Sequence, residues 1–456
     1  MKDIIMDTIN MKHQSGRHKN SSTVHLTDAQ LSIEVIKDLN TFDSISRQWN
    51  DLVEETDSHI FQTFEWQRIW WKYFGENSES HFLHIILFRQ NDHLIGIAPF
   101  FVDLYKYFGK PLYRCLRLIG SKIMQDADKM STGWLTHSDY LDLIIKPGYE
   151  DVVYQGLRDY FLQYEVLDDI IMEEIDGRSS LLSNFVVLLN EINDFWKVEI
   201  ENSSVCPIVE LNGDWDQFLK GLSSNMRYQV RRFIKRASDG NKKKIFDIYQ
   251  FDKEEEIGPA YEKLVHFHQN RWNDRGRPGA FNEQRMYQFY KEITSTFHKK
   301  GWLQFQKVTV PEQKNQCVAI DLMFRYNKTV YLIHRGFDDS SSYAEYGPGN
   351  SLLYTVIKEA ADDGFKCYDF LRGDESYKFR VATNAIQNKN IIIRKVQKST
   401  VSLLLFYHFI YRMIFLKRRI RFEWSIIANY FKSKRPVNAL RSYTNDLSSR
   451  IALKFK

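Results

Sequence analysis

One order of predicted elements occurs twice along the chain, and this duplication constrains the fold more than any other feature. Residues 82–102, FLHIILFRQNDHLIGIAPFFV, alternate between apolar and polar over two runs that flank Gln90-Asn91-Asp92. This pattern is typical of a β-hairpin. Residues 302–337 repeat it as a strand, a polar turn and a strand, and then add a further short turn and strand.

The two halves also continue alike. Residues 138–175 predict a strand, the dipeptide Pro147-Gly148, an amphipathic helix, and a strand with acidic residues near its end. Residues 331–373 predict a strand, Pro348-Gly349, an amphipathic helix and a strand that ends in Asp369. Because order and turn chemistry agree, we expect a duplicated α/β unit rather than an array of short repeats.

The 456 residues are too many for one typical core, which also favours two or more domains. We expect a disordered leader over residues 1–30, a first α/β domain over 31–204, a second over 205–398 with a helical insertion at 222–300, and a basic, aromatic helical tail over 399–456. In the first domain Trp66, Trp70, Trp71 and Phe74 share one broad face of a predicted helix, and we expect them in the core.

Composition points to a protein of the cytoplasm. The net charge of +5 is small for this length, and Cys115, Cys206, Cys317 and Cys367 lie far apart, as expected in a reducing compartment. We predict no membrane-spanning segment, because no stretch reaches the roughly 18 apolar residues required. The nearest, residues 401–416, is interpreted as a buried helix or as a helix that lies on anionic lipid at the inner membrane face.

Between the two halves, a basic stripe is predicted on one helix. Asp214 is the expected N-cap of a short helix, and Ser223 or Ser224 that of a longer one. On the longer helix Arg227, Arg231 and Lys235 recur every four residues, with Arg232 and Arg236 adjoining. The stripe predicts either a solvated face or contact with a phosphate-rich partner, which could be a cofactor tail, an RNA acceptor stem or a lipid headgroup.

The stretch YGPGNSLLYTV, residues 346–356, predicts a helix that begins on a Gly-Pro-Gly turn. Free N–H groups at such a helix end attract anions such as phosphate. Proline is also common in the first turn of helices in general, so the alternative to an anion site is a plain helix start.

The sequence resembles the GNAT-like acyltransferases of the CelD and BioF2-like group, which are related to the Fem-type peptidoglycan bridge enzymes. The matching pieces, in consistent order between residues 61 and 380, are FQTFEW, HLIGIAPFF, SDYLDLIIKPG, SSNMRYQVRR, VAIDLMF, RGFDDSSSYAEYGPGNSLLY and YDFLRGDESYKFR. The resemblance implies an α/β fold of tandem GNAT-like domains with mixed sheets, and an acyl-donor site in the second domain.

The resemblance also implies where the donor binds. Gly347 and Gly349 match the two glycines of the GNAT loop that holds the donor's pyrophosphate, and the N–H groups of Asn350 and Ser351 are expected to face the anion. Ala344 stands where that loop has Gln or Arg, so the donor need not be acetyl-CoA itself. We expect acetyl-CoA or another acyl-CoA as co-substrate and no permanently bound cofactor.

Acyl transfer to an amine requires a base, a proton donor for the thiolate and stabilisation of the oxyanion. We predict Asp338 or Asp374 as the base and Tyr343 or Tyr377 as the proton donor. Arg372 and Lys378 are expected to neutralise phosphate. The alternative for residues 373–378 is a solvated turn in which Asp369 caps the next element.

No metal site is predicted, because His266 and His268 fall on opposite sides of a helix, and no hydrolase or Walker pattern is present.

These observations predict an N-acyltransferase that moves an acyl group from an acyl-CoA-like thioester to an amino group on a cell-envelope or polysaccharide precursor. The envelope role is implied by the resemblance alone. Two alternatives stay open. One is a Fem-type transferase that draws its acyl group from aminoacyl-tRNA held by residues 227–244, and the other is a non-catalytic module of a polysaccharide synthesis complex.

Overall fold

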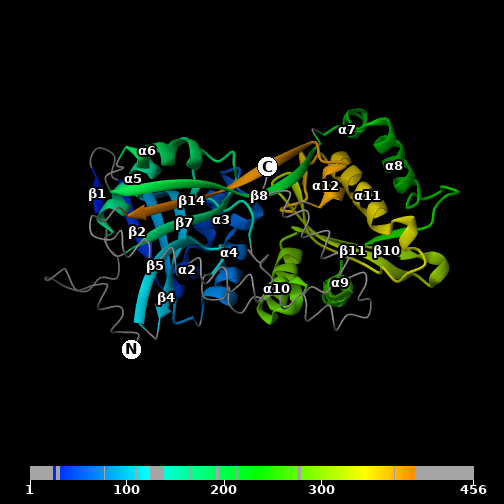
Figure 1. The fold of residues 1–456 in the computed structure, drawn as a ribbon, viewed down its shortest axis with the longest axis horizontal. Helices are drawn as coiled ribbons and strands as arrows, with labels where there is room; N and C mark the ends of the chain where they lie inside the picture. Colours follow the sequence, from blue (N-terminus) through cyan, green and yellow to red (C-terminus); the bar gives the residue numbers. More distant parts are fainter. Residues whose placement is uncertain are drawn as a thin grey trace. The chain divides into compact units, whose positions relative to one another are not determined.

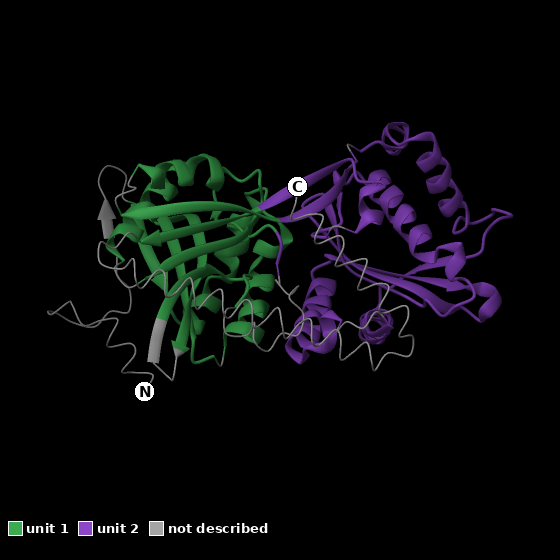
Figure 2. Cartoon of the chain, in the orientation of Figure 1, with its two compact units in different colours: residues 1–124, 140–203, 389–399 green, residues 125–139, 204–388, 400–456 purple. Residues whose placement is uncertain are grey.

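The computed structural model describes residues 24–26, 31–76, 78–107, 110–123, 138–164, 167–191, 195–211, 213–274, 279–373 and 375–395. Within them the chain forms two compact units (Figure 2). The first unit contains the described residues up to 123, from 140 to 203, and from 389 onward. The second contains residues 138–139 and 204–388. The predicted tail lies outside the described residues, and of the predicted leader only 24–26 are described.

The first unit combines a mainly antiparallel sheet with short helices. Its elements are β1 (Val24–Leu26), β2 (Leu31–Ile36), α2 (Leu39–Ser44), α3 (Ser46–Glu54), η1 (Ile60–Gln62), α4 (Phe64–Trp70), η2 (Trp71–Gly75), β3 (His81–Gln90), β4 (His93–Tyr107), β5 (Lys110–Leu118), β6 (Ile144–Ile145), α5 (Glu150–Gln163), β7 (Asp169–Ile175), η4 (Leu181–Phe185), α6 (Val186–Asn190) and the first part of β8 (Trp196–Glu210).

In this unit the strands lie in the order β1-β2-β3-β4-β5-β7-β14-β8. The β3–β4 hairpin turns at Asn91 and Asp92, both with positive φ, as the type I′ geometry of a two-residue hairpin requires. Trp66, Trp70, Trp71 and Phe74 are all buried, so their predicted place in the core is confirmed.

The second unit contains α7 (Trp215–Gly221), α8 (Ser224–Lys235), β9 (Asp247–Gln250), α9 (Glu254–Asp274), η5 (Ala280–Asn282), α10 (Gln284–Lys299), β10 (Leu303–Val310), η6 (Pro311–Gln313), β11 (Gln316–Tyr326), β12 (Thr329–Phe337), η7 (Ala344–Tyr346), α11 (Pro348–Asp362), β13 (Cys367–Asp369), α12 (Ser376–Phe379) and the first part of β14 (Asn384–Lys395). Its strand order is β8-β13-β12-β11-β10-β9.

Helices cover both faces of this second sheet (Figure 1). On one face α7, α8 and α11 bury a core that includes Phe218, Val230, Phe233 and Leu352. On the other face α9 packs on β11 and β12, and α10 packs on α9 and β10. The predicted caps are confirmed, since Asp214 accepts hydrogen bonds from the first turn of α7 and Ser223 from the N–H of Met226 in α8.

The two units repeat one topology. Each has an antiparallel run of three strands, β3-β4-β5 and β10-β11-β12, and the third strand then pairs in parallel with a strand that follows a helix. The parallel pairs are β5 with β7 and β12 with β13. The predicted duplication is therefore present in the fold.

Each unit also buries an aspartate–arginine pair across the second and third strands of its run. Asp103 and Arg117 approach to 3.4 Å in the first unit. In the second, Asp321 accepts a hydrogen bond from Nε of Arg335 at 2.8 Å.

One strand of the first unit differs from the sequence prediction. The strand expected directly before Pro147-Gly148 is only the two-residue β6, which pairs with β4, and the parallel partner of β7 is β5. Strand β5 was not predicted because Arg114 and Arg117 interrupt its apolar pattern. Arg117 is nevertheless buried, since its guanidinium contacts the carboxylates of Asp103 and Glu173.

Two long strands, β8 and β14, begin in one unit and end in the other. Among the described residues, no helix combines the length and apolar character needed to cross a membrane.

Candidate functional site

The parallel strands β12 and β13 separate after a short pairing. They pair only through Thr329–Cys367, Val330–Tyr368 and Tyr331–Asp369. Beyond this point β12 continues to Phe337, whereas β13 ends at Asp369. The carboxyl ends of neighbouring parallel strands are where α/β sheets place ligands.

A β-bulge lies at this separation. Leu332 pairs with Met323 and His334 pairs with Leu322 on β11, so Ile333 is an extra residue on β12. A bulge takes one residue out of the ladder and re-aims the residues beside it. The second half of β12 is thus irregular where it separates from β13.

The Gly-Pro-Gly turn opens α11 next to this edge, and packing explains both glycines. Gly347 has φ 67°, which favours glycine, and a Cβ there would lie 2.7 Å from a ring carbon of Phe233. A Cβ on Gly349 would lie 2.6 Å from a ring carbon of Phe337 at the end of β12. The turn therefore seats α11 against both α8 and β12.

The first-turn N–H groups of α11 do not have the arrangement expected from the sequence. The N–H groups of Asn350 and Ser351 both donate to the carbonyl oxygen of Gly347, at 3.0 and 3.1 Å. Pro348 has no N–H, and within the described residues the N–H of Gly349 donates to no backbone carbonyl. The Ser351 hydroxyl is buried and lacks a hydrogen-bond partner. Gly349 thus offers the N–H that an anion would meet in this turn.

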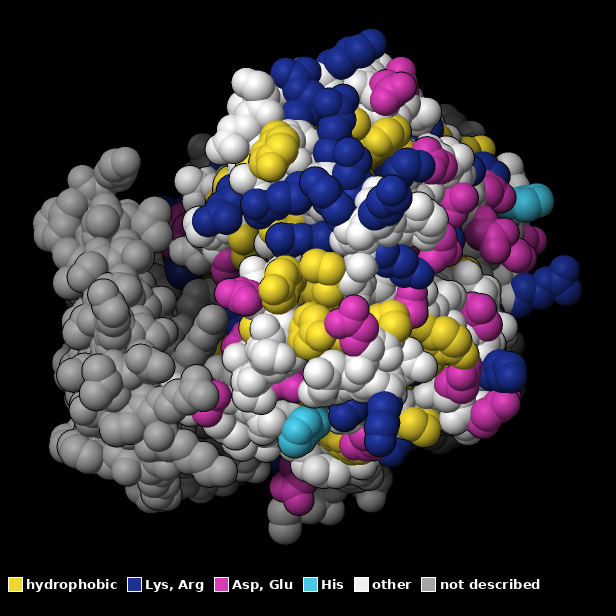
Figure 3. All heavy atoms as spheres, turned by 90° about the vertical axis from the view of Figure 1, so that its right-hand side faces the viewer, with side chains coloured by type: hydrophobic (Ala, Val, Ile, Leu, Met, Phe, Trp, Pro, Cys, Tyr) yellow, Lys and Arg dark blue, Asp and Glu magenta, His cyan; other side chains and the backbone are white. Residues whose placement is uncertain are grey.

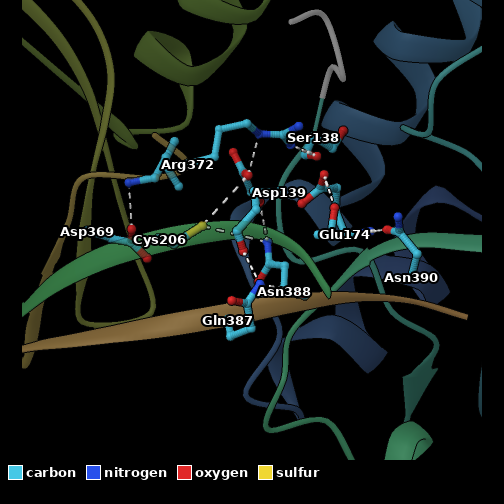
Figure 4. A network of polar contacts seen from close by, with 12 residues as sticks. Ser138, Asp139, Glu174, Cys206, Asp369, Arg372, Gln387, Asn388 and Asn390 are labelled. Atoms are coloured by element: carbon cyan, nitrogen blue, oxygen red, sulfur yellow. Dashed lines mark hydrogen bonds and ion pairs between the residues drawn. The ribbon is translucent and has the colours of Figure 1, made fainter. Parts of the chain in front are cut away.

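Arg372, three residues after β13, anchors a polar network in the second unit (Figure 4). Its Nε donates to Oδ1 of Asp139 at 2.6 Å, and its terminal nitrogen donates to the carbonyl oxygen of Ser138. The buried Asn388 donates from Nδ2 to Sγ of Cys206 at 3.6 Å. The network fixes residues 138–139 against the loop that follows β13.

A cluster of imidazole and aromatic rings adjoins this network. His334 on β12 meets the rings of Tyr290 and Phe281 edge-on, with centroids 4.5 and 4.7 Å apart, and that of His268 at 5.6 Å. Burial lowers the pKa of His334 well below its ordinary value, and His268 lowers it further. Its Nε2 is buried without a hydrogen-bond partner.

Neighbouring groups connect and orient this cluster. Burial raises the pKa of Tyr290, whose phenol also interacts electrostatically with Asp139 and Arg372. Trp272 donates from Nε1 to Nε2 of His268 at 3.0 Å. Burial lowers the pKa of His268 to about 4. His268 is therefore a neutral acceptor held in place, and His334 stands beside it with a free nitrogen.

The predicted phosphate-neutralising residues already have partners. Besides Arg372, the buried Lys378 donates from Nζ to the carbonyl oxygen of Arg372 at 2.7 Å and pairs with Glu375 at 3.0 Å. Tyr377 is half-buried and lies near the guanidinium of Arg335, whose carbon is 5.9 Å from the ring centroid. Asp369 accepts from the N–H of Leu371 at 2.7 Å, as the turn alternative predicts.

The remaining predicted catalytic residues lie in the loop after β12. Asp338 accepts from the backbone N–H and the hydroxyl of Ser340, at 3.1 and 2.6 Å. The Tyr343 hydroxyl donates to Glu312 at 3.2 Å. Within the described residues no hydrogen bond joins either of them to Tyr377, and Asp374 lies outside the described residues. No group of three His, Cys, Asp or Glu side chains suited to a metal ion occurs in the described part of the chain.

The predicted basic stripe lies on α8. Arg231, Arg232 and Lys235 are exposed and Arg227 is half-buried. Arg236 contacts the turn before α11, since its guanidinium donates to the carbonyl oxygen of Tyr346.

Sequence reasoning missed Asp139, Tyr290 and His334. Their only signal was residue type: an Asp beside a strand, and a His and a Tyr in apolar runs. Only the fold brings Asp139 to Arg372, because 233 positions separate them.

Comparisons with known proteins bear on this arrangement. Residues 224–379 match the acetyltransferase (GNAT) domain family. No curated protein matches the chain. Among solved structures, FemX is similar at 11% identity, with 78% of this chain and 96% of FemX covered and a TM-score of 0.52.

Two further structures were found. L-PGS from Bacillus licheniformis is 10% identical to this chain, and the match covers 81% of this chain and 95% of L-PGS, with a TM-score of 0.44. A tandem GNAT protein from the clavulanic acid biosynthesis pathway has 9% identity, 80% and 99% coverage, and a TM-score of 0.39. The likeness to FemX shows a shared fold. The chain thus has the α/β fold with tandem GNAT-like units, and its residues 224–379 are similar to the acetyltransferase (GNAT) domain family.

Proposed function

We propose that the protein is a GNAT-type N-acyltransferase that moves an acyl group from an acyl-CoA-like thioester to an amino group on a cell-envelope or polysaccharide precursor. The narrower resemblance to the CelD and BioF2-like group, on which the envelope role rests, belongs to this proposal. So does the place of action, in the cytoplasm or at the inner membrane face.

The observation that carries the proposal is the separation of β12 from β13 inside the region that matches the GNAT family. An extended thioester can lie against the edge of β12 beyond Tyr331, where β13 no longer pairs with it, close to the bulge at Ile333. The donor's pyrophosphate would then meet the start of α11, with Gly347, Gly349, Asn350 and Ser351 as its binding residues. Among the described residues, the N–H of Gly349 donates to no backbone carbonyl.

The reaction forms a C–N bond as the amine attacks the thioester carbonyl, and it breaks the C–S bond when the tetrahedral intermediate collapses. The amine gives up a proton and the leaving thiolate takes one. His334 is our preferred base, because its Nε2 has no hydrogen-bond partner and a neutral imidazole has one nitrogen that can accept a proton. Asp338 and Asp374 as bases, and Tyr343 and Tyr377 as proton donors, stay predictions.

Arg372 and Lys378 stay predicted phosphate contacts, but a phosphate would have to replace their present partners. For Arg372 we favour a positioning role, in which it holds Asp139 beside Tyr290.

The test is calorimetric titration of the full chain with CoA, acetyl-CoA and longer acyl-CoAs, using wild type and Asn350→Asp. This isosteric change places a negative charge where the pyrophosphate is expected, and a carboxylate in the first turn of a helix favours the folded state. We expect micromolar binding by the wild type and a loss of at least tenfold in the variant. Gln284→Glu, in the first turn of α10, is the matched control and should bind like wild type.

Equal affinity of wild type and Asn350→Asp for acyl-CoA would contradict binding of the donor at the start of α11. Failure of the wild type to bind any CoA derivative would contradict the proposal and favour one of the two alternatives, a tRNA-borne donor or a non-catalytic module. Titration with aminoacyl-tRNA would then separate these two.

A further inference from the structure

The outer face of α8 is strongly basic. In the described part of the chain, no carboxylate lies within ion-pair distance of Arg227, Arg231, Arg232 or Lys235. Neighbouring cations repel one another, and the positive charge of Arg232 contributes to lowering the pKa of Arg236, after burial. The stripe can therefore attract an external anion.

The same end of the second unit extends this charge. Lys242 and Lys243, in the loop that follows α8, are exposed, whereas Lys244 pairs with Asp239 and Asp247. Figure 3 shows Lys and Arg side chains gathered across the upper part of this face, with hydrophobic side chains between them and most acidic ones farther to the right. We call the residues of α8 and its loop the basic face: Arg227, Arg231, Arg232, Lys235, Lys242 and Lys243.

A tyrosine stands in the middle of the basic face. Tyr228 precedes Arg231, Arg232 and Lys235 by three, four and seven positions, so all four share one side of α8. Tyr228 is 62% exposed, so its ring is available to a partner. Tyr346, 37% exposed, adjoins the end of α8, where the Arg236 guanidinium lies 5.5 Å from its ring centroid.

The inner side of α8 is fixed in the core. Val230 and Phe233 are buried among residues of α7 and α11, so the basic face is a rigid outward surface. A tyrosine ringed by long cationic side chains suits the headgroup region of a bilayer, where its ring and hydroxyl are both accommodated. Four to eight Lys and Arg residues on an amphipathic helix are typical of sites for anionic lipid. RNA recognition along a strand stacks successive bases on several aromatic side chains, whereas Tyr228 is the one exposed aromatic side chain on α8.

We propose that the basic face docks the protein on an anionic lipid bilayer, with Tyr228 entering the headgroup layer. The proposal rests on α8 and does not depend on the acyl-transfer reaction. It is also separate from the predicted lipid contact of residues 401–416, which lie outside the described residues.

The test is co-sedimentation of the full chain with vesicles of phosphatidylcholine alone or with about one third phosphatidylglycerol. We expect binding only to the anionic vesicles, and weaker binding as NaCl increases. The triple variant Arg231→Glu, Arg232→Glu, Lys235→Glu should bind at least about 100-fold more weakly, since each basic residue near such a surface contributes roughly a fivefold factor. Tyr228→Ser should weaken binding severalfold without changing the net charge.

A charge-matched control carries Arg47→Glu, Lys122→Glu and Lys197→Glu, all exposed residues of the first unit, and should bind like wild type. Equal loss in this control would reduce the effect to net charge and overturn the proposal. Tight binding of tRNA that depends on the basic face, without vesicle binding, would overturn it in favour of RNA. Loss of acyl-CoA affinity in the triple variant with vesicle binding intact would assign the face to the donor's phosphates instead.

Discussion

His334 is the residue at which the proposed chemistry can be tested most directly. His334→Gln keeps a polar side chain of similar size but cannot accept a proton near neutral pH. We expect kcat for an identified acceptor to fall by about 10²- to 10⁴-fold, while the calorimetric affinity for acyl-CoA is unchanged. His266→Gln, an exposed histidine of the same region, is the control. An unaltered kcat in His334→Gln, with a large loss in Asp338→Asn, would return the role to Asp338.

Asp142 gives a second test at the residue scale, through pH. Burial raises the pKa of this carboxyl to about 6, from 3.8 in the unfolded chain. The folded protein therefore keeps the proton at pH values where the unfolded chain has lost it. The contribution of Asp142 to the free energy of unfolding increases as pH falls from 7 through 6 toward 4.

Asp142→Asn places a neutral group at this position at every pH. We expect the variant to be more stable than wild type at pH 7 by on the order of 2 kcal/mol, with the difference shrinking as pH falls below 6. Urea unfolding at several pH values measures this difference. A difference that stays constant with pH would show that Asp142 is ionised to the same extent in both states.

At the scale of elements, two constraints act at the start of α11 and can be measured separately: a positive φ at Gly347 and the close contact of this residue with Phe233. Gly347 and Gly364 both have positive φ, 67° and 73°. A Cβ at Gly347 would contact Phe233, whereas one at Gly364 would meet no heavy atom within 4 Å. Gly364→Ala should cost about 1 kcal/mol through backbone strain alone. Gly347→Ala should cost at least about 1 kcal/mol more through overpacking, as measured by urea unfolding. Equal losses would mean that Phe233 moves away freely.

Periodicity and turn chemistry predicted most elements of both units. The β3–β4 hairpin, the three strands before α11, the capped α7 and α8, and α11 itself all follow local rules that a sequence displays. Strand β5 was not predicted, because Arg117 can be buried there only through its contacts with Asp103 and Glu173, which are distant in sequence.

The site was less predictable than the elements. The bulge at Ile333 depends on the register between two strands, and the contact of Arg372 with Asp139 depends on how distant segments fold together. Residue type suggested the glycines of the α11 turn, but not that the N–H groups of Asn350 and Ser351 would be taken by Gly347. Local chemistry can be read along the chain, whereas partners across a sheet cannot.

At the scale of the whole molecule, the first unit needs a strand that follows the second unit in the sequence. Residues of β14 pair with β7, as in Ile391–Met172 and Ile393–Ile170. Ile391 and Ile393 are buried in the core of the first unit. A fragment of residues 31–203 alone should therefore give a broad thermal transition. The same fragment joined through a flexible linker to residues 384–395 should unfold cooperatively at higher temperature. Identical melts of the two fragments would contradict this dependence.

The late position of β14 has a consequence for biosynthesis. A ribosome makes proteins from the amino end, and multidomain chains generally fold in that order. Here the first unit cannot close its sheet until the residues after position 388 have left the ribosome, when the second unit has already been made. Until then the edge of β7 is unpaired, and such an edge invites association with other chains. The unit translated first should be the last to mature, and nascent chains stalled before β14 should be those that chaperones hold longest.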